Sequence, residues 1–297
     1  MIARQTVVRW LWRIPLCVAV LFAGQMLGVA LVSALGLELP SAPVAVDEGT
    51  QSLLFFPAAI AIAVALAGMA VGLAGRWWER VAILAAFIYV VYGVGTVIEA
   101  SIFTTLGGEV PLAVMHLPPS VLGALAVPLL FAAPSGEDFR ERAAAFFSGW
   151  KQGKLAARIG LAVLAFPFFY YLFGMMVAPI VTPHYARLDF LITPPLPTML
   201  KVLFTRSVLL LLVSLPVIVA WRESRGRLIL ALGIGHFVAV GLAALIQATF
   251  FPAVLRWTHG IEILADSICY AAALAWLFFP RLSRAGEEQP ALQERLA

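Results

Sequence analysis

Eight long runs of apolar residues alternate with shorter polar segments along the chain of 297 residues. A helix of about 20 predominantly apolar residues crosses the hydrocarbon core of a bilayer, and each run is close to this length. Lipid offers the backbone no hydrogen-bonding partner, so such a run crosses as a helix and not as an open strand. The predicted spans cover residues 14–35, 53–74, 81–105, 112–133, 155–180, 202–220, 228–251 and 260–279.

This pattern predicts an all-α integral membrane protein, a polytopic bundle of about eight transmembrane helices. We expect residues 1–280 to form a single transmembrane domain and the polar residues 281–297 to form a disordered cytoplasmic tail. Between spans four and five, an amphipathic stretch that ends at Trp150 predicts a helix lying along the membrane surface. Four prolines within residues 181–201 predict a stiff, extended connection between spans five and six.

Composition supports the membrane assignment and excludes other classes. Apolar residues make up 62% of the chain and charged residues 12%, whereas about a quarter of the residues in soluble domains are charged. A soluble chain of this length has no interior large enough for so much apolar surface. The net charge of +4 comes from basic residues in short loops between apolar runs, a distribution that argues against a nucleic-acid-binding domain.

The loop charges predict the orientation of the spans. If both termini lie on one side, 16 of the 20 Lys and Arg residues fall on that side and four on the other. Cytoplasmic loops carry the excess of Lys and Arg in membrane proteins. We therefore expect a multi-pass protein of the cell (inner) membrane with its N- and C-termini in the cytoplasm.

Two similar segments, 148 residues apart, indicate an internal repeat. Residues 98–103 read IEASIF and residues 246–251 read IQATFF, and the same offset places spans one to four on spans five to eight. Because each half has an even number of helices, the halves would share one orientation, as in some transporters. The hypothesis is a 4+4 parallel repeat; the alternative is a chance match within an alphabet of few apolar residue types.

Polar and ionisable residues within the spans gather in the predicted outer half of the bilayer. Such residues are costly to place in lipid and usually face protein or a water-filled cavity. On span eight, His259, Glu262 and Asp266 share one helical face. The set comprises Glu99, His116, Arg206, Gln247, Arg256, His259, Glu262 and Asp266.

Three hypotheses account for this set. The first is a structural network of ion pairs that clamps the helices together, as expected for a structural or accessory membrane subunit. The second is a cavity for a small polar or lipid-derived ligand, with transport as the associated activity, lined by Glu99, Arg206, Gln247, Arg256, Glu262 and Asp266. The third is an intramembrane enzyme in which His259 and Glu262 form an acid–base pair or, with His116, bind a divalent metal such as zinc.

No enzyme signature in the sequence decides between these hypotheses. Peptidases of the CAAX-protease type carry paired glutamates within a span, but the only such pair here, Glu287 and Glu288, lies in the tail. The rhomboid pattern G-x-S-x-G and the nucleotide-binding P-loop are also absent from the sequence. The expected partners are therefore the lipid bilayer and a small-molecule or lipid ligand, with no nucleotide and no cofactor apart from the metal of the third hypothesis.

Overall fold

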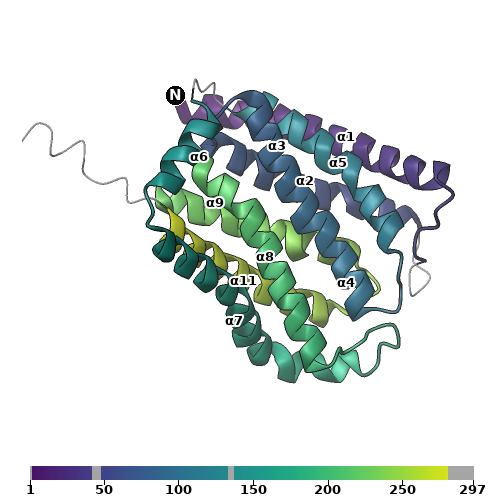
Figure 1. Ribbon diagram of the computed structural model, residues 1–297. Helices are drawn as coiled ribbons and strands as arrows, with labels where there is room; N and C mark the ends of the chain where they lie inside the picture. The colour runs from purple at the N-terminus through teal and green to yellow at the C-terminus, as the bar shows by residue number, and fades with distance from the viewer. Residues whose placement is uncertain (1, 42–47, 133–136, 280–297) are drawn as a thin grey trace, which may run out of the picture.

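The computed structural model describes residues 2–41, 48–132 and 137–279, and the predicted tail lies outside these ranges. The described residues form a bundle of helices (Figure 1). Two π-helical segments, η1 and η2, interrupt the third and seventh spans. In chain order the elements are α1 (Ile2–Ala34), α2 (Glu48–Gly72), α3 (Trp77–Ile88), η1 (Tyr89–Val94), α4 (Gly95–Phe103), α5 (Glu109–Phe131), α6 (Phe139–Ser148), α7 (Gln152–Tyr185), α8 (Leu196–Ala220), α9 (Arg225–Phe237), η2 (Val238–Leu242), α10 (Ala243–Gln247) and α11 (Ala253–Phe278).

Eight helices of the described chain are long and apolar enough to cross a membrane, which confirms the predicted fold class. Several of their ends differ from the prediction. Helices α1, α2 and α8 begin at Ile2, Glu48 and Leu196, before the predicted residues 14, 53 and 202. Span five continues to Tyr185, because prolines within α7 do not end the helix, and only residues 186–195 remain as a non-helical connection. Span eight begins at Ala253, just after Pro252, because a helix face rich in polar residues hid its first two turns from a search for apolar runs.

The predicted amphipathic helix is α6, which lies at one end of the bundle (Figure 1). The Asp138 side chain accepts a hydrogen bond from the backbone amide of Arg140 and caps the helix. Arg142 anchors the helix to the end of α8, where it donates to the carbonyl oxygens of Val219 and Trp221 at 3.0 and 2.8 Å. These bonds satisfy carbonyl groups that the end of α8 leaves free.

The two halves of the chain repeat the same succession of elements at an offset of 148 residues. Both bounds of α2 map onto those of α8, and the first residues of α3 and α4 map onto those of α9 and α10. The π-helical segments η1 and η2 also fall at equivalent places. Helices α1 and α7 occupy opposite edges of the bundle (Figure 1), as a two-fold relationship requires. This agreement supports the predicted 4+4 repeat.

The halves meet at a short antiparallel bridge between the connections that follow α2 and α8. Leu73 pairs with Trp221, its equivalent at the offset of 148. The amide of Ala74 donates to the carbonyl of Ala220 at 2.8 Å, and the amide of Arg222 donates to the carbonyl of Gly72 at 3.0 Å. The offset converts each of these bonds into the other, so an approximate two-fold axis passes through the bridge.

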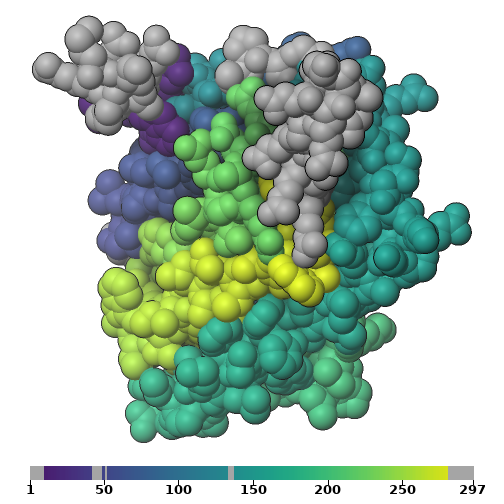
Figure 2. All heavy atoms as spheres, turned by 90° about the vertical axis from the view of Figure 1, so that its left-hand side faces the viewer, coloured from purple at the N-terminus to yellow at the C-terminus, as the bar shows by residue number. Residues whose placement is uncertain are grey.

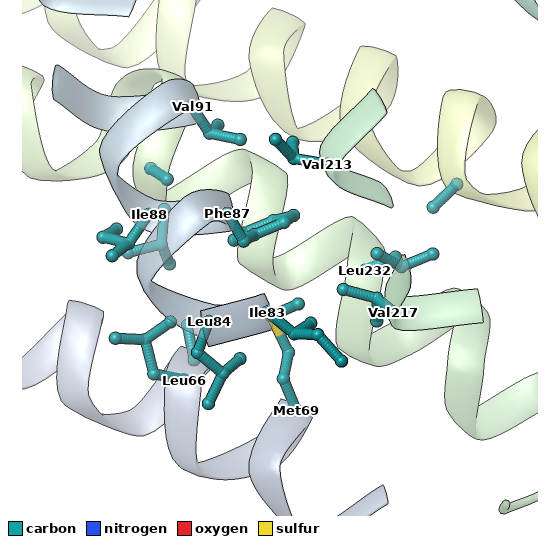
Figure 3. Packing of buried hydrophobic residues seen from close by; sticks show 14 of the residues in the cluster. Leu66, Met69, Ile83, Leu84, Phe87, Ile88, Val91, Val213, Val217 and Leu232 are labelled. Carbon is teal, nitrogen blue, oxygen red and sulfur yellow. The ribbon is translucent and has the colours of Figure 1, made fainter. Parts of the chain in front are cut away.

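Apolar packing joins the two halves along this axis. Helix α2 packs against α9, η2 and α10, and α8 packs against α3 and η1, so each half places its second helix against the third span of the other. Figure 2 views the bundle from the left of Figure 1, with α9 and α11 (green and yellow) between the N-terminal helices and α7. Buried side chains from four of these helices and η1 interdigitate in Figure 3: Leu66, Met69, Ile83, Leu84, Phe87, Ile88, Val91, Val213, Val217 and Leu232.

Candidate functional site

The predicted polar set separates into two groups in the structure. Glu99, Arg206, His259, Glu262 and Asp266 meet in a charged group between α4, α7, α8 and α11. His116 and Gln247 instead line a cavity between α1, α2, α5 and α10. Arg256 belongs to neither group: it forms no ion pair within the described ranges, and its buried Nε atom has no hydrogen-bond partner there.

In the charged group, Arg206 of α8 forms an ion pair with Glu99 of α4, a residue 107 positions earlier in the chain. The arginine side chain is 8% exposed and the glutamate side chain 46% exposed. The guanidinium also lies 5.8 Å from the centre of the Phe166 ring of α7, a cation–π arrangement. The pair therefore joins the third span of the first half to the second helix of the other half.

Helix α11 adds a hydrogen-bonded chain to this group. His259 Nδ1 lies 2.7 Å from Glu262 Oε2, one turn further along the helix. Its other ring nitrogen, Nε2, is hydrogen-bonded to the hydroxyl of Tyr185 of α7, and the two rings stack with centroids 5.8 Å apart. The imidazole thus connects a tyrosine hydroxyl on one side to a carboxylate on the other.

Asp266 lies one further turn along α11 and is 6% exposed. Its Oδ1 atom accepts no hydrogen bond from any described residue, although Glu262 and Arg206 both lie within electrostatic range of the carboxylate. Tyr170 of α7 lies within range of all four charged side chains, namely Glu99, Arg206, Glu262 and Asp266. The group therefore sets three carboxylates against one guanidinium.

Tyr170 and Tyr185 also belong to the charged group, although the sequence did not predict them as site residues. Both lie in α7, whose central part is apolar and carries no charge between Arg158 and Arg187. The three tyrosines of this helix, Tyr170, Tyr171 and Tyr185, are a signal, because a buried phenol hydroxyl usually finds a polar partner. That signal does not identify the partner.

The cavity has a volume of about 330 Å³ and a mainly apolar lining. It lies among α1, α2, η1, α4, α5 and α10 and includes the segment after α10. This volume is at the lower end of the range of small-molecule sites, about 300–1,000 Å³. The polar residues in its lining are Gln25, Tyr92, Thr96, His116, Ser120 and Gln247.

Most of these polar groups already have partners. The hydroxyls of Thr96 and Ser120 each donate to a backbone carbonyl one turn earlier in their own helix, both at 2.7 Å. The Gln247 amide donates to the carbonyl of Ala243 at 3.0 Å and to the Tyr92 hydroxyl at 3.4 Å. Their hydrogen-bonding capacity is therefore used in large part by the protein itself.

In the part of the chain that the structure describes, Gln25 and His116 are the exceptions, and of the two only His116 is buried. It is 4% exposed, and neither ring nitrogen has a hydrogen-bond partner among the described residues. The Tyr92 ring meets the imidazole edge-on at a centroid distance of 4.7 Å. A Cβ atom on Gly93 of η1 would lie 3.0 Å from the Cβ atom of His116, so the absence of a side chain at Gly93 makes room for His116. A π-helical segment at such a place is often associated with a functional site.

The two groups occupy equivalent places in the two halves. Ala58, in the cavity lining, is equivalent to Arg206, and Gln247, also in the lining, is equivalent to Glu99. Each site combines one residue from each half: the charged group has the guanidinium of Arg206 paired with the carboxylate of Glu99, whereas the cavity has the methyl group of Ala58 and the neutral amide of Gln247. This difference in side-chain length leaves space at the cavity.

The predicted metal set is not brought together. His116 lies in the cavity lining, whereas His259 and Glu262 lie in the charged group. Within the part of the chain that the structure describes, no three His, Cys, Asp or Glu side chains gather as a metal-binding set. We therefore assign none of these side chains as a metal ligand.

Comparison with known proteins adds no assignment. No family model, no curated protein and no solved structure matches this chain.

Proposed function

We propose that this multi-pass membrane protein binds a small amphipathic, lipid-derived molecule in the cavity, with the polar group of the molecule at His116. The observation that carries the proposal is the buried imidazole of His116, which lines a cavity of about 330 Å³ without a hydrogen-bond partner for either ring nitrogen among the described residues. An unpartnered buried polar group costs about 1–3 kcal/mol. A ligand that supplies the missing hydrogen bonds recovers that free energy.

The chemistry of the lining defines the ligand class. A neutral imidazole offers one N–H donor and one nitrogen acceptor, so it suits a hydroxyl or carboxyl group, each of which can donate and accept. The remaining lining is mainly apolar, with contributions from Leu21, Phe55, Ile62 and Met115. An alkyl chain is therefore the fitting body for a ligand whose head bonds to His116.

Transport fits this proposal better than static storage. The cavity lies at the interface between the two halves, since α1, α2 and α5 of the first half meet α10 of the second. In transporters built from repeats, the substrate site lies at such an interface and alternating access comes from movement of one repeat against the other. With the predicted orientation, in the cell (inner) membrane and with cytoplasmic termini, the cavity belongs to the outer half of the bilayer.

Binding is tested with full-length protein in lipid nanodiscs and with probes that share one chain length: octane, octan-1-ol and octanoate. We expect octan-1-ol and octanoate to raise the unfolding temperature more than octane does. In His116→Leu this preference should disappear, with a loss in affinity of about tenfold, or about 1.4 kcal/mol. Ala59→Phe, which fills the cavity, should abolish binding of all three probes.

His236→Leu is the matched control, because His236 is equally buried but lies outside the cavity lining. It should bind the probes as the unmodified protein does. Equal affinity of the unmodified protein, His116→Leu and Ala59→Phe for octan-1-ol would contradict the proposal, because the probe would then bind elsewhere or only partition into the lipid.

A further inference from the structure

We propose that Asp266 is a proton-binding site and that Tyr185, His259 and Glu262 form the chain that carries protons to it. This site lies in the charged group and shares no residue with the cavity lining. It therefore adds an activity to the proposed ligand binding and does not depend on it.

Two hydrogen bonds link the first three members of the chain, and helix geometry places Asp266 next to the third. The Tyr185 hydroxyl is bonded to His259 Nε2, and His259 Nδ1 lies 2.7 Å from Glu262 Oε2. Glu262 and Asp266 are four residues apart on α11, so their side chains lie one above the other on the same helical face. The side chain of His259 is 24% exposed and that of Glu262 is 8% exposed. The chain thus leads from an accessible imidazole to a buried carboxylate.

Asp266 is suited to receive the proton. Its Oδ1 atom accepts no hydrogen bond from the described residues. A buried carboxylate is costly unless it is paired, hydrogen-bonded or neutralised, and the guanidinium of Arg206 is already committed to Glu99. Protonation needs one oxygen atom only, whereas a bound metal ion would need several converging ligands, and no such set is present in the described ranges.

The groups that face Asp266 come from several helices, and each acts on its charge. Glu262 and Cys269 belong to α11, Arg206 to α8 and Tyr170 to α7, while Glu99 of α4 faces Tyr170 and pairs with Arg206. Of the titratable side chains of α9, His236 faces Tyr270 one turn further along α11, whereas Arg225 and Arg227 lie in the first turn of α9. The described parts of η2 and α10, which also pack against α11, carry no titratable side chain.

The transfer proceeds in balanced steps. The Tyr185 hydroxyl takes a proton from water and gives its own proton to His259 Nε2, while His259 releases the proton on Nδ1 to Oε2 of Glu262, which leaves a neutral imidazole and a carboxylic acid. Glu262 passes its proton to Oδ1 of Asp266 and becomes a carboxylate again. The net result is one proton removed from water and one neutral Asp266; the reverse sequence returns the proton.

The test uses infrared difference spectroscopy of full-length protein in nanodiscs, from about pH 4 to about pH 9, a range that includes documented buried carboxyl groups. The measured signal is the carbonyl stretch of protonated carboxylic acids. We expect a band that rises as the pH falls and that Asp266→Asn removes. Glu109→Gln, at an exposed carboxylate at the start of α5, should leave that band unchanged.

The chain is tested by the rate at which the same band appears after a rapid pH drop. His259→Phe should slow that rate by about 100-fold, the lower end of what a positioned proton-transfer group contributes, and Tyr185→Phe should slow it less. A purely structural role would change stability without changing this rate. A band that persists in Asp266→Asn would overturn the site, and an unchanged rate in His259→Phe would overturn the chain.

If Asp266→Asn does not fold, Glu262→Gln replaces it. This variant should retain the band and lose the fast phase of its appearance. Retention of the fast phase would contradict the proposal. Probe binding in the cavity, measured on the same samples, separates a failure of this inference from a failure of the ligand proposal.

Discussion

Leu73 and Trp221 face each other in an antiparallel bridge although 148 residues separate them, and that separation is the offset of the internal repeat. The bridge is therefore a contact between equivalent residues on an approximate two-fold axis. Positions related by this axis occur once in each half, but many of them carry different side chains. The cavity and the charged group are such a pair, and the differences between them lead to specific predictions.

An ion pair introduced into the cavity at the equivalent positions should fill the cavity. In the double variant Ala58→Arg/Gln247→Glu, the cavity lining acquires, at the equivalent positions, the two side chains that pair as Arg206 and Glu99 in the charged group. The new pair should occupy the cavity, because its counterpart occupies the equivalent place. We expect the double variant to fold and to lose binding of octan-1-ol, measured by the shift in unfolding temperature.

The single variant Ala58→Arg is the control for this ion pair. It places a cation in a buried site without its carboxylate, which costs about 3–5 kcal/mol. The double variant should recover most of that loss. If Gln247→Glu does not restore the stability of Ala58→Arg, the two sites are not equivalent in three dimensions.

Replacement of His116 should raise the stability of the ligand-free protein while it removes binding. In His116→Leu, a buried group without hydrogen-bond partners among the described residues is replaced by an apolar one, a gain of about 1 kcal/mol. In His236→Leu we expect a loss of about 1 kcal/mol instead, because Nε2 of His236 lies 3.0 Å from the Ser214 hydroxyl and that buried hydroxyl would lose its partner. Thermal unfolding without probe distinguishes the two; a loss in both would argue that His116 has a partner.

When Arg206 is replaced, the resulting loss of stability should depend on pH, because the carboxylates of the charged group remain. Arg206→Met leaves Glu99, Glu262 and Asp266 without the guanidinium, and two of these carboxylates are buried. We expect a loss of about 3–5 kcal/mol at neutral pH. The loss should shrink as the pH falls, because carboxylates repel each other only when ionised and protonation removes their charge.

Glu99→Gln is the matched variant of that ion pair. Its side chain is half-exposed, and Arg206 keeps Asp266 within electrostatic range. The expected loss is therefore about 1 kcal/mol or less. Unfolding temperatures measured at several pH values test both variants, and an equal loss in the two would contradict this account of the charges.

One methyl group added at Gly72, next to the bridge, should lower the stability of the protein. A Cβ atom on Gly72 would collide with the six-membered ring of Trp221, whereas a Cβ on Gly68, one turn earlier in α2, would meet nothing within 4 Å. We expect Gly72→Ala to cost about 1–3 kcal/mol. Gly68→Ala should be neutral or stabilising, because alanine favours a helix. A neutral Gly72→Ala would show that the ends of α2 and α8 can separate at no cost.

The sequence alone determined the helical fold and the number of spans. The reason is physical: lipid leaves the backbone no partner, so each long apolar run must become a helix, and its length follows from the bilayer. The spacing of residues 98–103 and 246–251 also indicated the repeat, since equivalent local structure needs similar residues at a constant offset. The predicted end of α7 was wrong because its prolines do not end the helix, and the predicted start of α11 was wrong because polar residues extend the helix beyond its apolar part.

Only the tertiary structure decided which polar side chains meet. The sequence grouped Glu99 with Gln247 and His116 with His259, because each lies in the same half of the bilayer, but depth in the membrane does not fix the direction of a side chain. The rotation and packing of helices, more than 100 residues apart in the case of Glu99 and Arg206, separate these residues into a charged group and a cavity. Packing also leaves His116 without a partner among the described residues, and it places Ala58, whose equivalent is Arg206, in the lining of the same cavity.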